Sequence, residues 1–486
     1  MLPFLRRVVA LLSLGVIAAT AAAGDAGGKI PVSSTSPEAL ASFREGQTLV
    51  DNLRLTDAIP HFEKAIAADP EFALAHLYAA QTATNAKTFF AEMDKAARLS
   101  EYVSRGEQLW IKGTRAGATG DAAGQRALYQ ELATLYPEDE RALTLLGISY
   151  FAQQEWTDAV HWLSKATTVN PGFAPAYNQL GYAYRFINRF DDAEKTFAKY
   201  TELIPNDPNP YDSYGELLLR MGKFDDAVVQ YRKALGVNSR FANSFAGIAA
   251  ARMYQGRHTD AFREMEQALA VARNDGERRG AYFAMAVIAM DQGNTEQALE
   301  HIRKQYAVAE AITDVAAMAG DLVLEGNVLI NARKGKEARD RYDRALALIR
   351  ESALAADVKE NAALVYHYNA GRAAVVSGDL AAADAEAEKL LKGAEAKKNQ
   401  NQIRLGHELA GTIALARKDF DRAVDELLQA NQQDASNAYR LALAYQGGAK
   451  KDEARDAARR AAEFRSLPAM NYAFIRTRAE KLLSTL

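Results

Sequence analysis

Apolar and small side chains recur along the chain with a 34-residue period, most clearly over residues 142–275. Leu146, Leu180 and Tyr214 share one position of this repeat, and a glycine follows each of them. Later in each unit an alanine recurs at the same interval. A fixed period between about 20 and 50 residues is typical of repeat arrays. The pattern therefore favours one continuous array over the roughly three domains that the length would otherwise suggest.

Each unit predicts two antiparallel helices joined by a tight turn. In one clear unit, Leu146, Gly147 and Tyr150 fall on one face of the first helix, and Ala159 and Leu163 fall on one face of the second. Aspartates open each second helix, as in INRFDDA and MGKFDDA. We expect these carboxylates to satisfy free N–H groups and to complement the helix dipole. Several units close with a proline, placed where the second helix has ended.

Weaker copies of the unit extend the array in both directions. Gly46 and Phe62 mark a first unit, and residues 72–104 form a degenerate one. Downstream of Ala261, the alanine that opens each second helix recurs mostly at longer intervals, which predicts longer helices. About eleven units fit into residues 40–462. The alternative is an irregular helical bundle with accidental similarity to the repeat.

The spacing also divides the chain into segments. Residues 39–275 are expected to form an array of 34-residue units, and residues 276–462 an array of longer, degenerate units. A terminal unit exposes a face that a neighbour would otherwise cover, so a solenoid needs a cap. We expect residues 463–486 to form a capping helix. Its apolar stripe would consist of Phe474, Ile475, Leu482 and Leu483.

These positions resemble the unit of the tetratricopeptide repeat family, which carries the same order of large, small, aromatic and alanine residues with a closing proline. The resemblance covers nearly all of the chain from position 39 onward. It implies an all-α fold, a right-handed superhelical solenoid of stacked antiparallel helix pairs whose first helices line a concave surface. It also implies a scaffold that binds protein or peptide partners.

Residues 1–23 have the features of an export signal. Arg6 and Arg7 precede an apolar run over residues 8–18, and small residues follow. This run is shorter than the roughly 20 residues that span a bilayer. Cleavage after Ala23 would place the protein in the periplasm or elsewhere in the cell envelope, and an uncleaved membrane anchor is the alternative. Residues 24–38, rich in Gly, Ser and Pro, are expected to form a flexible lead-in.

Composition narrows the choice of partners and chemistry. Apolar residues make up 49% of the chain and charged residues 25%, which is the balance of a folded protein. The net charge of −3 provides no excess for binding nucleic acid, so none is expected as a partner. The absence of cysteine excludes disulfides, thiolate zinc sites and cysteine nucleophiles. The basic stretch after Lys450 alternates with acids and is interpreted as a solvated helix face.

No catalytic or metal-binding motif in the sequence is complete. Gly222 and Lys223 are not followed by the Ser or Thr that a phosphate-binding loop needs. His407 lacks a second histidine at the fourth position after it, so a zinc-protease helix is not formed. Paired aspartates recur at one helix start, which favours capping over acid–base catalysis. We therefore expect no catalytic residue, no cofactor and no metal.

The candidate binding residues lie on three successive first helices, on the face that turns away from the packing positions. They are Phe151, Asn178, Tyr182, Arg185, Phe186, Asp212, Glu216 and Arg220. Aromatic residues and arginine supply much of the energy of protein interfaces, so this mixture suits a peptide or a helix. The alternative is that Tyr182 and Phe186 pack against adjacent helices and that the other residues are ordinary surface.

The sequence thus favours an exported, non-catalytic scaffold of the cell envelope that binds partner proteins on its concave repeat surface. The alternative is a protein that binds a small molecule or a polysaccharide, or an enzyme, with a pocket among the longer C-terminal repeats.

Overall fold

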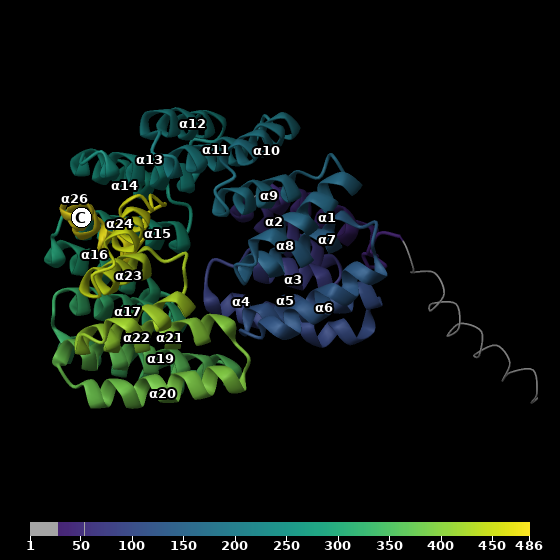
Figure 1. Cartoon of the computed structure of the whole chain (residues 1–486). Helices are drawn as coiled ribbons and strands as arrows, with labels where there is room; N and C mark the ends of the chain where they lie inside the picture. Colours follow the sequence, from purple (N-terminus) through teal and green to yellow (C-terminus); the bar gives the residue numbers. More distant parts are fainter. Residues whose placement is uncertain (1–27, 53) are drawn as a thin grey trace, which may run out of the picture.

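All regular structure in the described residues, 28–52 and 54–486, is helical in the computed structural model (Figure 1). Over this part of the chain the helices form twelve pairs of neighbouring helices in contact, and successive pairs stack. The predicted all-α solenoid of stacked helix pairs is confirmed, with one pair more than the sequence count. The predicted signal, residues 1–23, lies outside the described residues.

The first array consists of seven pairs: α1 (Pro37–Asp51) and α2 (Leu55–Ala68), α3 (Ala73–Gln81) and α4 (Ala86–Leu99), α5 (Arg105–Ala118) and α6 (Ala122–Leu135), α7 (Glu140–Ala152) and α8 (Trp156–Val169), α9 (Ala174–Phe186) and α10 (Phe190–Leu203), α11 (Asn209–Arg220) and α12 (Phe224–Val237), and α13 (Ala242–Tyr254) and α14 (His258–Val271). A short 3-10 turn, η1 (Ser100–Tyr102), follows α4.

The second array consists of five pairs: α15 (Asp275–Asp291) and α16 (Thr295–Ala311), α17 (Val315–Asn331) and α18 (Gly335–Glu351), α19 (Ala356–Ser377) and α20 (Leu380–Ala396), α21 (Gln400–Arg417) and α22 (Phe420–Gln429), and α23 (Ala435–Gly447) and α24 (Lys451–Ala462). Helices α15 to α21 contain 17 to 22 residues, against 9 to 15 in the first array. The longer helices inferred from the longer repeat steps are therefore present.

A close approach between a glycine and a large side chain recurs within the pairs. A Cβ atom on Gly181 would lie 2.7 Å from the Phe197 ring, and one on Gly215 would lie 2.9 Å from the Tyr231 ring. Both distances are too short for a real Cβ atom, so the position requires glycine. The same sixteen-residue spacing joins Gly46 to Phe62, Gly113 to Tyr129, Gly147 to Leu163, Gly326 to Tyr342 and Gly411 to Leu427.

Aspartates cap the second helices α6, α20 and α22, but those near the start of α8, α10, α12 and α14 do not cap them as expected. Asp191 and Asp192 lie in the first turn of α10, and Arg189 occupies the N-cap position without a side-chain hydrogen bond. The carboxylate of Asp192 instead accepts a hydrogen bond from Arg189 Nε at 2.7 Å. The aspartates thus follow the N-cap position instead of occupying it, although they still lie at the positive end of the helix dipole.

The described part of the predicted flexible lead-in differs from that expectation. Ile30 is buried, and its N–H group donates to Asp139 Oδ2 at 2.8 Å. The N–H group of Ser33 donates to Glu107 Oε1 at 2.7 Å. Carboxylates at the starts of α7 and α5 thus hold residues 28–36 against the first array, and α1 already begins at Pro37.

The C-terminal segment, residues 463–486, also differs from a single capping helix. It contains an irregular stretch with Pro468, then α25 (Met470–Ala473) and α26 (Arg476–Thr485). Helix α26 packs on α24, as a cap should, and buries Leu482. Residues 463–475, which precede α26, instead contact helices from the middle of the sequence.

These contacts join the last helix pair to α11, α13 and α15. Arg476 forms an ion pair with Asp291 of α15, at 2.6 Å between Nη2 and Oδ2. Tyr472, Phe474 and Ile475 share one hydrophobic cluster with α13, α15, α23 and α24. In Figure 1 the yellow C-terminal helices accordingly lie between the teal helices α13 and α14 and the green helices α19 and α20. The array therefore folds back on itself.

The two arrays also contact each other directly. Arg273, just before α15, pairs with Asp57 of α2 at 2.6 Å. Arg404 of α21 donates to the carbonyl oxygen of Gln153 at 3.0 Å. None of the helices among the described residues combines the length and apolarity that a membrane crossing needs.

The glycine contact gives a direct test of the packing. Replacing Gly181 by alanine forces a methyl group against Phe197, and we expect the free energy of unfolding to fall by about 1–3 kcal/mol. The matched control is Gly236→Ala in α12, where an added Cβ meets no atom within 4 Å. That change removes backbone freedom from the unfolded chain and should stabilise by about 0.5–1 kcal/mol. Urea unfolding followed by circular dichroism measures both, and equal shifts of the midpoint would contradict the packing account.

Candidate functional site

The eight predicted groove residues lie on three successive first helices, α7, α9 and α11, but their surroundings differ. Phe151 lies on α7. Asn178, Tyr182, Arg185 and Phe186 lie on α9. Asp212, Glu216 and Arg220 lie on α11. They separate into a buried polar network, an aromatic cluster and one arginine held by the C-terminal segment.

Asn178 and Asp212 are buried and are used in contacts between neighbouring units. The Ser213 hydroxyl donates to Asn178 Oδ1 at 3.0 Å, and the Ser244 hydroxyl donates to Asp212 Oδ1 at 2.7 Å. The two residues are 4% and 5% exposed. Burial raises the pKa of Asp212 to about 7. A partner could reach neither residue without separating the stacked units, which differs from their predicted place on an open groove.

Tyr182, Arg185 and Glu216 form a closed ion-pair network. Arg185 Nη1 lies 2.6 Å from Glu216 Oε1, and the Tyr182 hydroxyl donates to Glu216 Oε2 at 2.9 Å. The Arg185 guanidinium also lies over the Tyr182 and Phe186 rings at 4.9 and 4.8 Å. Burial and the nearby Glu216 carboxylate raise the pKa of Tyr182 well above its usual range. Tyr182 thus packs against the neighbouring first helix, as the alternative interpretation of the sequence predicts.

Phe151 and Phe186 meet Trp156, which the sequence analysis did not select. Phe186 stacks on Trp156 with ring centroids 4.4 Å apart and nearly parallel planes. Phe151 contacts Trp156 edge-on at 4.9 Å. All three side chains are half-buried, so this aromatic cluster presents apolar surface at the ends of α7 and α9. Trp156 opens α8 in the turn QQEWTDA, and its place in this turn shortly after Phe151 is the signal in the sequence that could have found it.

Arg220 is held by main-chain atoms of the C-terminal segment. Its Nη1 donates to the carbonyl oxygen of Glu463 at 2.9 Å and also to that of Phe464. Tyr254 occupies the position of Arg220 in the next unit. Its hydroxyl donates to the carbonyl oxygen of Ser466 and accepts from the Ser466 N–H group at 3.2 Å. The ends of two successive first helices therefore bind one irregular stretch of chain, residues 463–466.

Phe186 and Arg220 line a cavity of about 470 Å³, the Arg220 cavity. Three arginines of the C-terminal region also line it, namely Arg459, Arg460 and Arg465. The acids that line it are Asp434 and Glu463, so positive charge is in excess. Burial and the neighbouring Arg185 lower the pKa of Arg220. The sequence pattern predicts a solvated helix face for this basic stretch, because the pattern does not reveal that α11 lies opposite.

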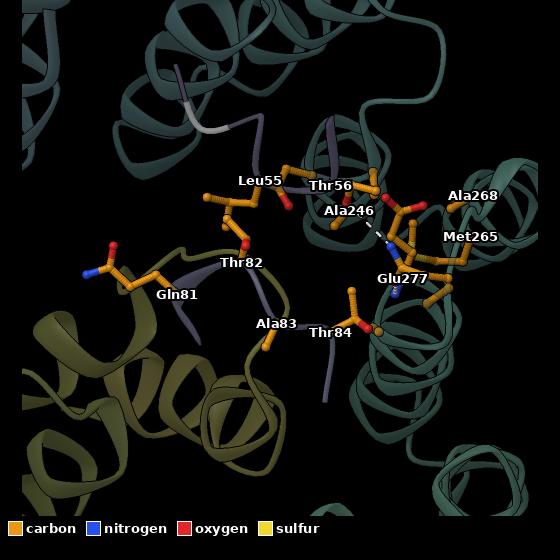
Figure 2. A pocket seen from close by; sticks show the side chains of 16 residues that line it. Leu55, Thr56, Gln81, Thr82, Ala83, Thr84, Ala246, Met265, Ala268 and Glu277 are labelled. Atoms are coloured by element: carbon orange, nitrogen blue, oxygen red, sulfur yellow. Dashed lines mark hydrogen bonds between the residues drawn. The ribbon is translucent and has the colours of Figure 1, made fainter. Parts of the chain in front are cut away.

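A second cavity, of about 320 Å³, lies between the α2 and α3 region on one side and α13, α14 and the start of α15 on the other (Figure 2). Figure 2 shows Leu55, Thr56 and residues 82–84 facing Met265 of α14 and Glu277 of α15. Asn274 bridges the two sides through a hydrogen bond from its Nδ2 to Thr56 Oγ1 at 3.4 Å. The lining carries a single carboxylate among mostly small or apolar side chains, so it offers contact surface rather than acid–base chemistry.

Among residues 28–52 and 54–486, no group of three His, Cys, Asp or Glu side chains is placed to hold a metal ion. Several histidines instead pair singly with carboxylates, such as His407 with Glu426 at 2.8 Å.

Comparisons with known proteins agree with the repeat pattern. Residues 43–99 and 112–175 match one tetratricopeptide repeat model, and residues 174–207 match another. These segments, less than half of the chain, are tetratricopeptide repeats, a type of repeat that typically forms protein-interaction scaffolds. No curated protein matches the sequence significantly.

Several solved structures resemble parts of the chain at low identity. The MamA protein is 23% identical, with 34% of this chain and 91% of that chain covered and a TM-score of 0.29. The APC/C hetero-tetramer Cut9-Hcn1 is 15% identical, with 89% and 78% covered and a TM-score of 0.40. A tetratricopeptide repeat protein from Parabacteroides merdae is 16% identical, with 54% and 98% covered and a TM-score of 0.36.

The buried carboxyl of Asp212 predicts a pH dependence of stability. Its pKa is raised from 3.8 to about 7 on folding, so the folded state keeps a proton that the unfolded state releases. The stability that this group contributes is present at low pH and is lost as the pH rises toward 7. Asp212→Asn keeps an acceptor for Ser244 but does not ionise. We therefore expect the free energy of unfolding of the native chain to fall, relative to that of Asp212→Asn, by on the order of a few kcal/mol from pH 5 to pH 8.

Urea unfolding of both proteins at the two pH values measures this difference. If the two free energies of unfolding differ by the same amount at pH 5 and at pH 8, the Asp212 carboxyl is ionised in the folded state over this whole range, which would contradict the prediction.

Proposed function

We propose that the chain is an exported, non-catalytic scaffold of the cell envelope that binds an extended segment of a partner protein along the ends of its first helices. The observation that carries this proposal is the binding of residues 463–466 by Arg220 and Tyr254. These hydrogen bonds use main-chain atoms of the bound stretch, and the Arg220 guanidinium also lies 5.3 Å from the centroid of the Phe464 ring. Main-chain hydrogen bonds also give affinity in the recognition of extended peptides by other proteins.

Phe186 supports the position of the partner. Phe186, Arg220 and Tyr254 occupy the same repeat position in three successive units. The C-terminal segment engages Arg220 and Tyr254, whereas Phe186 contacts Trp156 and Arg185 and stays half-exposed. A partner segment placed on the aromatic cluster would continue the line of the chain's own segment. Aromatic side chains are among the residues that most often supply interface energy.

The Arg220 cavity supports an acidic partner. Arg460 and Arg465 line it without an ion pair in the described residues, and Arg220 bonds there to carbonyl oxygens only. Opposite charge on the partner would speed association and fix its direction in the groove. The occupant we propose is therefore an extended protein segment that carries acidic residues beside apolar ones.

The proposed export rests on residues 1–23 alone. Two arginines followed by an apolar run and small residues have the order of a secretory signal. The periplasm or another part of the cell envelope is the proposed location, and an uncleaved membrane anchor stays the alternative.

The aromatic cluster gives the test of partner binding. We expect the full chain to recover a partner after cross-linking in cells and affinity purification, and Trp156→Ala/Phe186→Ala to lower the yield at least tenfold, since loss of hot-spot side chains costs about 2 kcal/mol or more each. The matched control is Tyr102→Ala, because Tyr102 is 86% exposed and lies on η1. Undiminished recovery by a double variant with native circular dichroism would refute the proposed surface.

Export is tested separately by sequencing the N-terminus of the mature protein. A cleaved signal predicts a start near Gly24 in a soluble envelope fraction. A start at Met1 in the membrane fraction would favour the anchor, and a start at Met1 in the cytosol would exclude export.

A further inference from the structure

A third cavity, in the second array, carries a different arrangement of charges. The Arg372 cavity, of about 210 Å³, is lined by the first helices α17, α19, α21 and α23 and, on the opposite side, by α25 and α26. Its size is below the usual range of about 300–1,000 Å³ for drug-sized ligands, so it suits a small molecule. It is separate from the aromatic cluster and the Arg220 cavity, with no lining residue in common.

Four arginines and one glutamate line the Arg372 cavity. The arginines are Arg333, Arg372, Arg440 and Arg478, and the glutamate is Glu408. Their formal charges leave an excess of +3 around a small space. Two of these charges, on Arg333 and Arg478, lie on exposed side chains, so the half-buried part of the lining carries an excess of +1, which an anion would offset.

Both carboxylate oxygens of Glu408 accept hydrogen bonds from neighbouring side chains. Its Oε1 lies 2.9 Å from Arg440 Nη1 and also accepts from the Tyr368 hydroxyl. Its Oε2 accepts from Asn437 Nδ2 at 3.1 Å. Burial acts to raise the pKa of Glu408, but Arg440 and Tyr368 outweigh it and the pKa is lowered, so the group is a carboxylate paired with Arg440.

Arg372 has no carboxylate of its own. Its only hydrogen bond in the described residues runs from Nη1 to Asn327 Oδ1 at 2.8 Å. Its guanidinium lies over the Tyr368 ring at 5.1 Å. Burial acts to lower the pKa of Arg372, but the neighbouring Tyr368, Tyr342, Glu408 and Asp434 raise it. Neither carboxylate bonds to Arg372, because Glu408 pairs with Arg440 and Asp434 accepts from the Ser436 N–H group at 2.7 Å and from Asn471 Nδ2 at 3.1 Å. The remaining donors of Arg372 are therefore free for a ligand.

Arg333 and Arg478 stand exposed at the rim and form no ion pair with any described residue. Phe474 and Ile475 add apolar surface to the lining. A guanidinium binds carboxylate and phosphate groups through two parallel hydrogen bonds. The apolar surface suits the carbon part of an organic anion.

We propose that the Arg372 cavity binds a small organic oxyanion, a carboxylate or a phosphate ester, with Arg372 as its central contact and Arg333 and Arg478 at the entrance. This site does not depend on the binding of a partner protein at the aromatic cluster. It gives the second array a ligand-binding role of its own.

The test is isothermal titration calorimetry of the full chain with succinate, methyl phosphate and inorganic phosphate at low salt, with sodium chloride as the control. We expect at least one oxyanion to bind with a Kd of about 1 mM or tighter. Arg372→Gln should weaken this binding at least about tenfold, and Arg478→Gln about threefold or more, because each removes a charged hydrogen bond or an ionic contact. Arg350→Gln on the exposed end of α18 is the matched control and should bind as the native chain does.

Preference for succinate assigns a carboxylate ligand, and preference for methyl phosphate assigns a phosphate ester. Absence of binding by all three oxyanions would overturn the proposal. So would binding that both Arg372→Gln and Arg478→Gln leave unchanged. If Arg372→Gln fails to fold, Arg478→Gln decides alone, because its side chain is exposed at the rim.

Discussion

The architecture depends on one close contact, between a glycine of the first helix and a large side chain at the sixteenth position after it. Gly181 against Phe197 and Gly215 against Tyr231 show the contact clearly. Since no larger residue fits, the contact fixes the register of the two helices in a pair. Each such pair then presents the same faces to its neighbours, and the apolar core divides into several clusters, the two largest of which span several pairs. A chain without cysteine can be stable on this basis, because each unit contributes its own packing.

The periodicity of the sequence predicts the repeated helix pairs, but it does not predict the contacts that occur only once, between segments far apart in the chain. The 34-residue spacing predicted the helix pairs, and its lengthening predicted the longer helices after Ala261, because each pair is specified by residues close in sequence. The C-terminal segment was different, since Arg220 binds Glu463 and Asp291 binds Arg476, both across much of the chain. Nothing in the local pattern of either partner indicates the other. The ordered lead-in has the same cause, because Ser33 is held by the distant Glu107.

The candidate site shows the same limit at the level of side chains. Positions that face away from the packing stripe in one unit are covered when the next unit stacks on it. Asn178 thus accepts from Ser213, and Tyr182 donates to Glu216, at separations of about one repeat. The C-terminal ends of the first helices are not covered by the next unit. For this reason Arg220 and Tyr254 can bind a distant segment, and Phe186 stays half-exposed. The repeat pattern does not single out Trp156 or Arg372 as candidate residues. Trp156 opens a second helix, and Arg372 lies in a unit whose period is longer than 34 residues.

The central claim is that the C-terminal segment closes the array onto its middle and so leaves the aromatic cluster as the open part of the groove. Hydrogen exchange of residues 463–475, followed by mass spectrometry of peptic peptides, tests it most directly. The account predicts that the hydrogen-bonded amides of this segment, those of Ser466 and of residues 473–475, exchange slowly, and that Tyr254→Phe speeds exchange in this segment while leaving α1 to α8 unchanged. Exchange of residues 463–475 at the rate of an unfolded peptide would contradict it.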